Sequence, residues 1–282
     1  MATLHSDPGK LQATAEALVA EAAEFVRRRR AQVFGVDAPS APDVVHTKSS
    51  PTDPVTVVDT ETERLIRDRL ARLRPGDAVL GEEGGGDDGA GPVTWVVDPI
   101  DGTVNFMYDV PAYAVSVAAQ VGGVSVAGAV ADVAGERIYS AGAGLGAHAH
   151  DRHGTTRLGC NDVTELPLAL LGTGFGYSAG RRAVQAALIA RVLPAVRDVR
   201  RIGSAALDLC MVAAGRLDAY YEHGTNRWDH AAGSLIAAEA GARVLLPDPE
   251  VDGAVVVAAA PGIADELLAL LKREGGLAPI PK

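Results

Sequence analysis

The chain is poor in aromatic residues and in cysteine. Only 4% of its 282 residues are aromatic, whereas 48% are hydrophobic, so its helices and strands are expected to be rich in alanine and valine. The two cysteines, Cys160 and Cys210, stand alone in the sequence without the spacing of a metal site. We therefore expect two free, buried thiols and no metal site built on cysteine.

The chain also lacks an excess of basic charge and a long apolar run. Its net charge of −10 argues against a nucleic-acid-binding surface and is compatible with a site that collects divalent cations. The longest apolar stretches, residues 112–121 and 254–260, have the length of strands, and the N-terminus lacks a basic segment followed by an apolar one. These absences predict a cytoplasmic protein that does not insert into a membrane.

The most informative segment that is present is WVVDPIDGTVNF, residues 95–106. Proline disfavours helix for the residue before it, so a buried strand is expected to stop at Asp98. Gly102 then permits a sharp turn after Asp101. Two aspartates, a turn carbonyl and water form an all-oxygen ligand set, which suits Mg²⁺ better than Zn²⁺. Asp-Pro and Asp-Gly are also ordinary turn dipeptides, so this segment alone is equally compatible with a structural turn.

Three further acidic motifs accompany this segment. Glu82 and a second glutamate follow a predicted strand at residues 77–80 and precede a loop rich in glycine and aspartate. Asp59 follows a strand-like run and precedes a predicted helix, for which Thr60 and Glu63 form a candidate capping box. Asp229 begins an amphipathic helix. Each motif alone is more typical of a solvated glutamate pair or a helix cap.

Together, these motifs strongly resemble the inositol monophosphatase family of lithium-sensitive, Mg²⁺-dependent phosphatases. The resemblance covers nearly the whole chain. Residues 48–63 resemble the mobile N-terminal metal loop of the family, and residues 200–224 resemble its bacterial, in particular actinobacterial, members.

The resemblance implies a role for individual residues. The first metal would be held by Glu82, Asp98, the Ile100 carbonyl and Asp101, and the second by Asp98, Asp101 and Asp229, with a weaker third ion near Glu82. The catalytic residues would be Thr103, Asp59 and Glu82, with Thr103 and Asp59 orienting the attacking water. Substrate would be bound by Gly102, Thr103, Ala205, Glu222 and Asp229, of which Gly102 and Thr103 offer backbone N–H groups to the phosphate.

One position departs from the animal members of the family. Asn226 stands three residues before Asp229, where a histidine is frequent. The implied metal ligands are unaffected. The departure leaves the substrate preference open, because this turn faces the alcohol part of the ligand.

The expected fold is an α/β (α+β) protein with two halves. Residues 1–160 would form helices over an antiparallel sheet and carry most of the metal ligands. Residues 161–282 would form an α/β half that carries Asp229 and the substrate contacts, so the site would lie in the cleft between the halves. The resemblance implies an αβαβα layered sandwich and a homodimer.

The expected function is Mg²⁺-dependent hydrolysis of myo-inositol 1-phosphate, or a related small phosphorylated polyol, with two or three ions per subunit. The sequence has no Cys-x5-Arg loop and no Asp-x-Asp nucleophile motif, which favours direct attack by water over a covalent intermediate. Alternative substrates are histidinol phosphate, fructose 1,6-bisphosphate and 3′-phosphoadenosine 5′-phosphate. A different alternative is a non-catalytic role as a protein partner of the transcription machinery.

Overall fold

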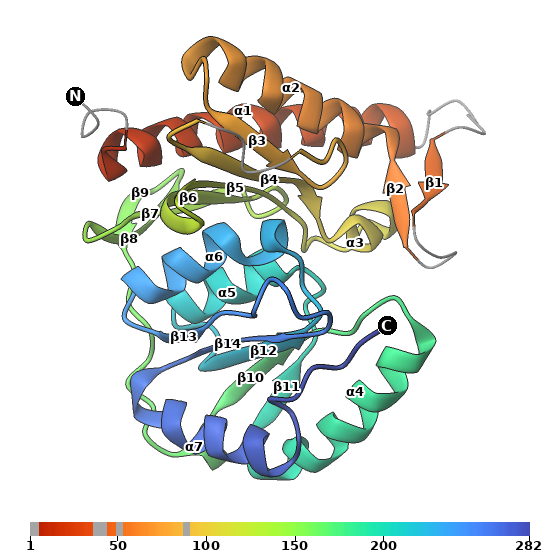
Figure 1. Ribbon diagram of the computed structural model, residues 1–282, viewed down its shortest axis with the longest axis vertical. Coiled ribbons are helices and arrows are strands. Elements are labelled where there is room, and N and C mark those ends of the chain that lie inside the picture. Colours follow the sequence, from red (N-terminus) through yellow and green to blue (C-terminus); the bar gives the residue numbers. More distant parts are fainter. Residues whose placement is uncertain (1–5, 36–43, 49–52, 87–90) are drawn as a thin grey trace.

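The computed structural model describes residues 6–35, 44–48, 53–86 and 91–282. Helices α1 (Pro8–Phe34) and α2 (Val57–Leu73) form an outer layer above a seven-stranded sheet. Helices α5 (Ala205–Ala213) and α6 (Arg227–Glu239) lie between this sheet and a five-stranded sheet (Figure 1). Helices α4 (Ala179–Val192) and α7 (Pro261–Arg273) cover the far face. The predicted αβαβα sandwich is confirmed.

The larger sheet has the strand order β3-β4-β5-β6-β7-β8-β9. Its strands are β3 (Ala78–Gly81), β4 (Thr94–Asp101), β5 (Ala114–Val121), β6 (Val124–Asp132), β7 (Arg137–Gly142), β8 (Gly146–Asp151) and β9 (Gly154–Arg157). All neighbours are antiparallel, as expected, except the parallel pair β3 and β4. This parallel pairing brings the ends of β3 and β4 to the same edge, which is where two of the acidic motifs follow.

Strand β4 departs from the sequence prediction because it does not end at Asp98. It continues to Asp101, and its pairing with β5 shifts register between these two residues. A register shift of this kind bends a strand and re-aims its side chains. The strand therefore continues past Pro99 with an irregular register, and both Asp98 and Asp101 still pair with β5.

The smaller sheet has the order β11-β10-β12-β14-β13. Its strands are β10 (Leu170–Thr173), β11 (Asp198–Arg200), β12 (Ala219–His223), β13 (Arg243–Leu245) and β14 (Val255–Ala259). Strand β10 runs parallel to β11 and β12, whereas β14 is antiparallel to β12 and β13. The short hairpin of β1 (Val45–Thr47) and β2 (Pro54–Thr56), the short helix α3 (Thr103–Tyr108) and two 3-10 turns, η2 (Leu166–Leu168) and η3 (Leu193–Ala195), complete the described elements.

The middle layer explains the abundance of alanine and glycine. Helices α5 and α6 are covered by sheets on both sides, so small residues are needed where the backbones approach one another. A Cβ atom on Gly233 of α6 would lie 2.8 Å from the Cβ of Leu209 in α5, and one on Gly128 of β6 would lie 3.0 Å from the Cα of Ala232. The low aromatic content thus follows from layers that pack closely.

The predictions about the two cysteines and about membrane insertion can be compared with the structure. Both cysteines are free thiols, but only Cys210 is buried, while Cys160 is partly exposed. Among the helices of the described residues, none is both long enough and apolar enough to cross a membrane.

Candidate active site

The fold gathers acidic side chains from both sheets and from the middle layer. Asp98 lies in β4 and is only 1% exposed. Burial raises its pKa well above the ordinary value, and the negative charges of Glu82, Asp101 and Asp229 raise it further. These interactions show that carboxylates separated by up to 147 positions in the sequence repel one another across a short distance in the fold.

Each of the three aspartates is held by one of its two carboxylate oxygens. Asp101 Oδ2 accepts hydrogen bonds from Ser204 Oγ at 2.5 Å and from Ala206 N at 2.7 Å. Asp98 Oδ1 accepts from the Ile100 N–H at 3.1 Å. Asp229 Oδ2 accepts from the backbone N–H of the helix cap, residue 226, at 2.5 Å. The other oxygen of Asp101 and of Asp229 accepts no hydrogen bond from the described residues.

This arrangement fits a hard cation. Groups that hold one carboxylate oxygen fix the orientation in which the other is presented, as in the outer shell of metal sites. Burial raises the pKa of Asp101 to about 7, although the hydrogen bonds from Ser204 and Ala206 act in the opposite direction. Buried carboxylates that repel one another need positive charge nearby, and their oxygens are the atoms that Mg²⁺ prefers. The described residues contain no group of three or more His, Cys, Asp or Glu side chains that already surround one point closely enough to hold a metal ion.

Lys48 supplies positive charge to this region, and the sequence analysis did not single it out. Its Nζ donates to Glu82 Oε1 at 2.7 Å and to Glu83 Oε1 at 2.5 Å. Burial alone would lower the pKa of Lys48, but the two carboxylates raise it above its ordinary value. Burial raises the pKa of Glu83 to about 7 despite this contact. The ammonium group therefore stands beside Glu82 where a metal cation was expected.

Thr103 and Asp59 contact each other, as the resemblance implied. Thr103 Oγ1 lies 3.2 Å from Asp59 Oδ1 and 3.0 Å from the Ile100 carbonyl oxygen, and its single proton can serve only one of them at a time. Asp59 is fully buried, and burial raises its pKa to about 6. Both side chains lie at the boundary between α2 and the end of β4.

The expected capping box at Thr60 and Glu63 is wrong. Helix α2 begins earlier, at Val57, with Thr56 as its cap and Asp59 as the third helical residue. Asp59 Oδ2 accepts from Thr56 N at 2.9 Å and from Thr56 Oγ1 at 2.5 Å. Val57 and Val58 form the first turn of the helix and do not extend the preceding strand. Asp59 therefore combines a capping role with its contact to Thr103.

Gly102 is required by the backbone at the start of α3. Its φ is +91°, and a Cβ atom would lie 3.0 Å from the Ala112 carbonyl oxygen and 3.1 Å from that of Gly203. An L-residue would be strained in this conformation and crowded by both carbonyls. The turn at Gly102 therefore starts α3 directly after Asp101, the last residue of β4.

Glu222 lies in β12 and is coupled electrostatically to Asp101, whose pKa it helps to raise. Tyr220 OH donates to Glu222 Oε2 at 2.7 Å. Burial raises the pKa of Glu222, whereas the Tyr220 hydrogen bond and the charge of Arg201 lower it. A Cβ atom on Gly174 would lie 1.8 Å from Glu222 Oε2, so the glycine leaves the space that this carboxylate fills.

The remaining predicted residue, Ala205, is the first residue of α5 and is 7% exposed. Its neighbours Ser204 and Ala206 hold Asp101, and the sequence analysis missed both. Ser204 is the cap of α5, and a serine before an apolar run is a recognisable signal for the start of a helix. Tyr177 was also missed, although its pKa is raised by burial and then by four carboxylates that include Asp101 and Asp229. No local sequence signal connects Tyr177 to the site.

Most of the expected N-terminal metal loop, residues 48–63, can be compared with the structure. Residues 49–52 lie outside the described residues, as do residues 87–90 of the loop after Glu82. Lys48 precedes residues 49–52 and contacts Glu82, and Asp59 follows them and contacts Thr103.

Comparison with known proteins places this chain and its fold in a family. A model of the inositol monophosphatase family matches residues 7–275. An inositol-1-monophosphatase from Mycobacterium tuberculosis is 68% identical over 284 residues, which cover 98% of each chain. A protein from Pasteurella multocida described as a Nus factor is 37% identical over 231 residues, 80% of this chain and 85% of the relative. The solved structure of SuhB from Mycobacterium tuberculosis covers 96% of this chain and 98% of its own, with 65% identity and a TM-score of 0.83.

The family model thus covers nearly the whole chain. The chain belongs to the inositol monophosphatase family, and it is a phosphatase that hydrolyses phosphoric monoesters.

Proposed function

We propose that the protein hydrolyses myo-inositol 1-phosphate to inositol and phosphate with Mg²⁺ as the cofactor. The observation that carries this proposal is the group of mutually repelling aspartates, each held by one oxygen, of which Asp98 is buried and Asp101 and Asp229 are partly exposed. The names of the mycobacterial relatives, which describe inositol-1-monophosphatases, support the substrate.

The metal ligands in this proposal are those that the resemblance implies. Glu82, Asp98, Asp101, Asp229 and the Ile100 carbonyl would hold the ions, with residues 1–160 providing most ligands and residues 161–282 providing Asp229. Bound Mg²⁺ neutralises phosphoryl oxygens, lowers the pKa of water and stabilises the departing alkoxide. Lys48 would have to release Glu82 when the metal binds, because the Lys48 ammonium group and the ion compete for the same carboxylate.

The attacking water is oriented by Thr103. When Thr103 Oγ1 donates its proton to Asp59, the oxygen keeps lone pairs that accept a hydrogen bond from the water. This contact fixes the direction of the water's own lone pair toward phosphorus. The backbone N–H groups of Gly102 and Thr103 donate to phosphate oxygens, which gather negative charge during the reaction.

The alcohol portion of the substrate is bound by Glu222 and the start of α5. Glu222 is already held through Oε2 by Tyr220, so Oε1 is the oxygen that accepts hydrogen bonds from ring hydroxyls. A buried carboxylate beside a phosphate dianion is unfavourable unless it contacts neutral donors, and cyclitol hydroxyls are such donors. Ala205 lines the same region from the first turn of α5.

Bisphosphate substrates are less well supported. A second phosphate needs basic residues near Glu222, and the sequence offers Arg200, Arg201 and Arg227. Arg200 is paired with Asp198 and Arg227 donates to Gln120, which leaves Arg201 as the cation whose charge acts on Glu222. A role beside the transcription machinery is suggested by the name of the Pasteurella relative, and it would coexist with the phosphatase.

The test is a steady-state assay with a panel of phosphate monoesters in Mg²⁺. We expect the highest kcat/KM for inositol 1-phosphate, inhibition by millimolar lithium, and no turnover in excess chelator. A higher kcat/KM for histidinol phosphate or for a bisphosphate would replace the substrate assignment. Turnover that persists in chelator would contradict the metal-based mechanism itself.

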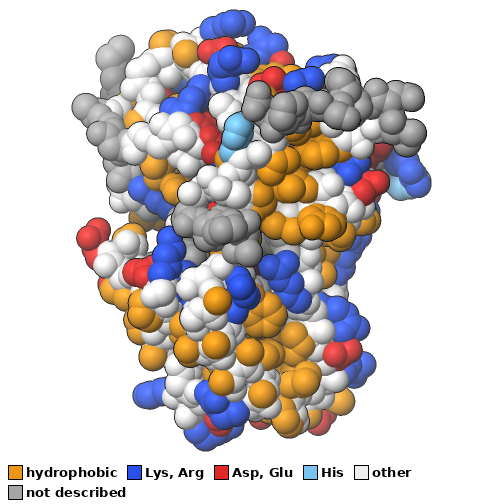
Figure 2. All heavy atoms as spheres, turned by 90° about the vertical axis from the view of Figure 1, so that its right-hand side faces the viewer, with side chains coloured by type: hydrophobic (Ala, Val, Ile, Leu, Met, Phe, Trp, Pro, Cys, Tyr) orange, Lys and Arg blue, Asp and Glu red, His pale blue; other side chains and the backbone are white. Residues whose placement is uncertain are grey.

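We also propose a homodimer. The face that carries α3 and α4 shows hydrophobic side chains gathered above and below its middle (Figure 2). Tyr108, at the end of α3, is 76% exposed, and Val110 after it is 44% exposed. Large exposed apolar groups of this kind are typical of protein interfaces. Sedimentation should give a dimer that Tyr108→Ser weakens, and a monomer at all concentrations would refute it.

A further inference from the structure

Glu63 is a buried acid that the proposed reaction does not use. It lies in α2, four residues after Asp59, and its side chain is only 3% exposed. The sequence pattern predicted that Glu63 caps the start of α2, but Thr56 and Asp59 have that role. A buried carboxylate needs hydrogen bonds and opposite charge in place of the water it has lost, so its partners indicate what it does.

The partners of the Glu63 carboxylate lie in or next to the turn that follows β3. Glu63 Oε2 accepts a hydrogen bond from Glu83 N at 2.8 Å, and Oε1 accepts one from Gly84 N at 2.8 Å. Arg67 Nε donates to Glu63 Oε1 at 2.7 Å, and Arg67 Nη2 donates to the Gly85 carbonyl oxygen at 2.6 Å. Glu63 and Arg67 therefore bind the backbone of this turn as a pair.

Two glycines let the turn approach this carboxylate closely. A Cβ atom on Gly81 would lie 2.4 Å from Glu63 Cδ, and one on Gly84 would lie 2.5 Å from Glu63 Oε1. A side chain at either position would push the turn and the carboxylate apart. The glycines on either side of Glu82 and Glu83 are therefore needed for the contact with Glu63.

The same turn carries Glu82, the glutamate among the proposed metal ligands. Glu82 N donates to the Val97 carbonyl oxygen at 3.2 Å, and Val97 directly precedes Asp98 in β4. Strand β4 thus fixes the start of the turn, and α2 fixes the residues that follow Glu82 through Glu63. The direction of a ligating side chain depends on how its backbone is held, so both attachments bear on the Glu82 carboxylate.

We propose that Glu63 is a positioning residue for the metal site, which fixes the turn after β3 and thereby the direction of the Glu82 carboxylate. This proposal rests on the proposed role of Glu82 as a metal ligand. Asp59, Glu63 and Arg67 follow one another at intervals of four residues and so share one face of α2. This helix face contacts Thr103 through Asp59 and the turn of Glu82 through Glu63, so it supports both parts of the proposed site.

The substitution Glu63→Gln tests the proposal by removing the charge and one of the two acceptor oxygens. Glu61→Gln, two residues earlier at a partly exposed position, is the matched control. Mg²⁺ binding is measured by isothermal titration calorimetry, and exchange of the Glu83 and Gly84 amide protons is followed by NMR in the metal-free protein. In Glu63→Gln, at least one of these amides should exchange faster.

The same substitution should weaken metal binding more than it slows the reaction. The Kd for Mg²⁺ should rise roughly 10- to 100-fold in Glu63→Gln, the effect of removing a group that orients a metal ligand. Because Glu63 is not itself a proposed ligand, kcat at saturating Mg²⁺ should stay within about 3-fold of the value for the unaltered protein. Glu61→Gln should change neither quantity.

A second variant tests the contact without changing the charge of Glu63. The φ of Gly84 is not positive, so alanine fits the backbone there, but its Cβ would push the turn away from Glu63 Oε1. Gly84→Ala should therefore raise the Kd for Mg²⁺ as Glu63→Gln does. Gly159→Ala, whose Cβ would meet no atom within 4 Å, is the control and should bind Mg²⁺ normally.

Glu82→Gln separates the failure of this proposal from the failure of the proposed function. A raised Kd for Mg²⁺ in Glu82→Gln, together with an unchanged Kd in Glu63→Gln and Gly84→Ala, would overturn the positioning role alone. An unchanged Kd in Glu82→Gln would remove Glu82 from the metal site and overturn both. Faster amide exchange in Glu63→Gln without a change in Kd would limit Glu63 to the structure of the turn and would also contradict the proposal.

Discussion

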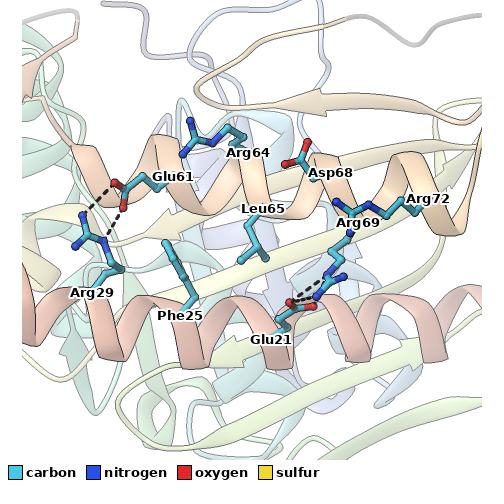
Figure 3. A pocket seen from close by; sticks show the side chains of 9 residues that line it. All are labelled: Glu21, Phe25, Arg29, Glu61, Arg64, Leu65, Asp68, Arg69 and Arg72. Atoms are coloured by element: carbon cyan, nitrogen blue, oxygen red, sulfur yellow. Dashed lines mark hydrogen bonds and ion pairs between the residues drawn. The ribbon is translucent and has the colours of Figure 1, made fainter.

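Charged side chains are arranged in opposite ways in two regions of the molecule. The groove between α1 and α2, of about 430 Å³, is lined by acids and arginines that pair across it (Figure 3). Arg29 Nε lies 2.7 Å from Glu61 Oε2, and Arg69 Nη2 lies 2.6 Å from Glu21 Oε1. At the candidate active site, by contrast, Glu82, Asp98, Asp101 and Asp229 repel one another.

The difference separates charges that join elements from charges that bind a ligand. The α1–α2 pairs are partly exposed and matched, so each contributes little to stability and needs no further partner. Glu82 is paired with Lys48, whereas Asp98, Asp101 and Asp229 have no ion pair among the described residues. Their mutual repulsion disfavours the ionised forms in the metal-free protein and, in the proposed function, favours a bound cation. Substitutions should therefore have opposite consequences in the two regions.

The largest effect is expected for Asp98→Asn and Asp229→Asn. Loss of a shared metal ligand removes charge and geometry together, so kcat/KM should fall by at least about 100-fold. The metal-free variants should melt at the same temperature or higher, because one repelling charge is gone. Glu61→Gln, in the α1–α2 groove, is the control and should retain full activity. Full activity in either aspartate variant would remove that residue from the metal site.

Thr103→Ala should lower kcat by about 10-fold or more while KM changes little, because the contact with water matters mainly in the transition state. Thr103→Ser keeps the hydroxyl and should retain most of the rate. Steady-state kinetics at saturating Mg²⁺ measures both. A rise in KM without a fall in kcat would assign Thr103 to packing at the start of α3.

Glu222→Gln should reduce the preference for inositol 1-phosphate over a simple aryl phosphate. The expected change is roughly 1 to 3 kcal/mol in the ratio of the two kcat/KM values. Hydrolysis of the aryl ester should be nearly unchanged. An equal loss of kcat/KM with both substrates would show that Glu222 supports the structure of the site and does not bind the alcohol portion of the substrate.

The metal-free protein should lose stability as the pH rises. Burial raises the folded-state pKa of Asp59 to about 6 and of Asp101 to about 7, above the unfolded value of about 3.9. The folded state therefore binds more protons between these values, and stability falls as pH rises from about 4 through 7. Saturating Mg²⁺ should flatten this dependence. Denaturant melts across pH, with and without chelator, check both parts, and a rise in metal-free stability over this range would contradict the burial of these charges.

The smallest effect is expected in the α1–α2 groove. Arg29→Gln breaks a partly exposed ion pair and should lower the free energy of unfolding by no more than about 1 kcal/mol. Activity should be unchanged. A larger loss, measured by chemical denaturation, would mean that the pair fixes α2 and hence Asp59.

The sequence by itself determined which acidic residues could form the candidate site. An all-oxygen acidic set in WVVDPIDGT, an aspartate at a helix start and a glutamate after a strand are local patterns. The structure places Asp229 in the first turn of α6, which begins two residues earlier, at Arg227. The family resemblance supplied the layered fold and the pairing of Thr103 with Asp59. Local patterns were less reliable for element boundaries, as the start of α2 and the continuation of β4 show.

Only the tertiary structure decided how the carboxylates are held and what else surrounds them. Ser204 and Ala206 reach Asp101 across more than 100 residues, and Lys48 reaches Glu82 across 34. Periodicity and turn signals report interactions within a few residues, whereas these contacts arise from the packing of layers, which no short segment encodes.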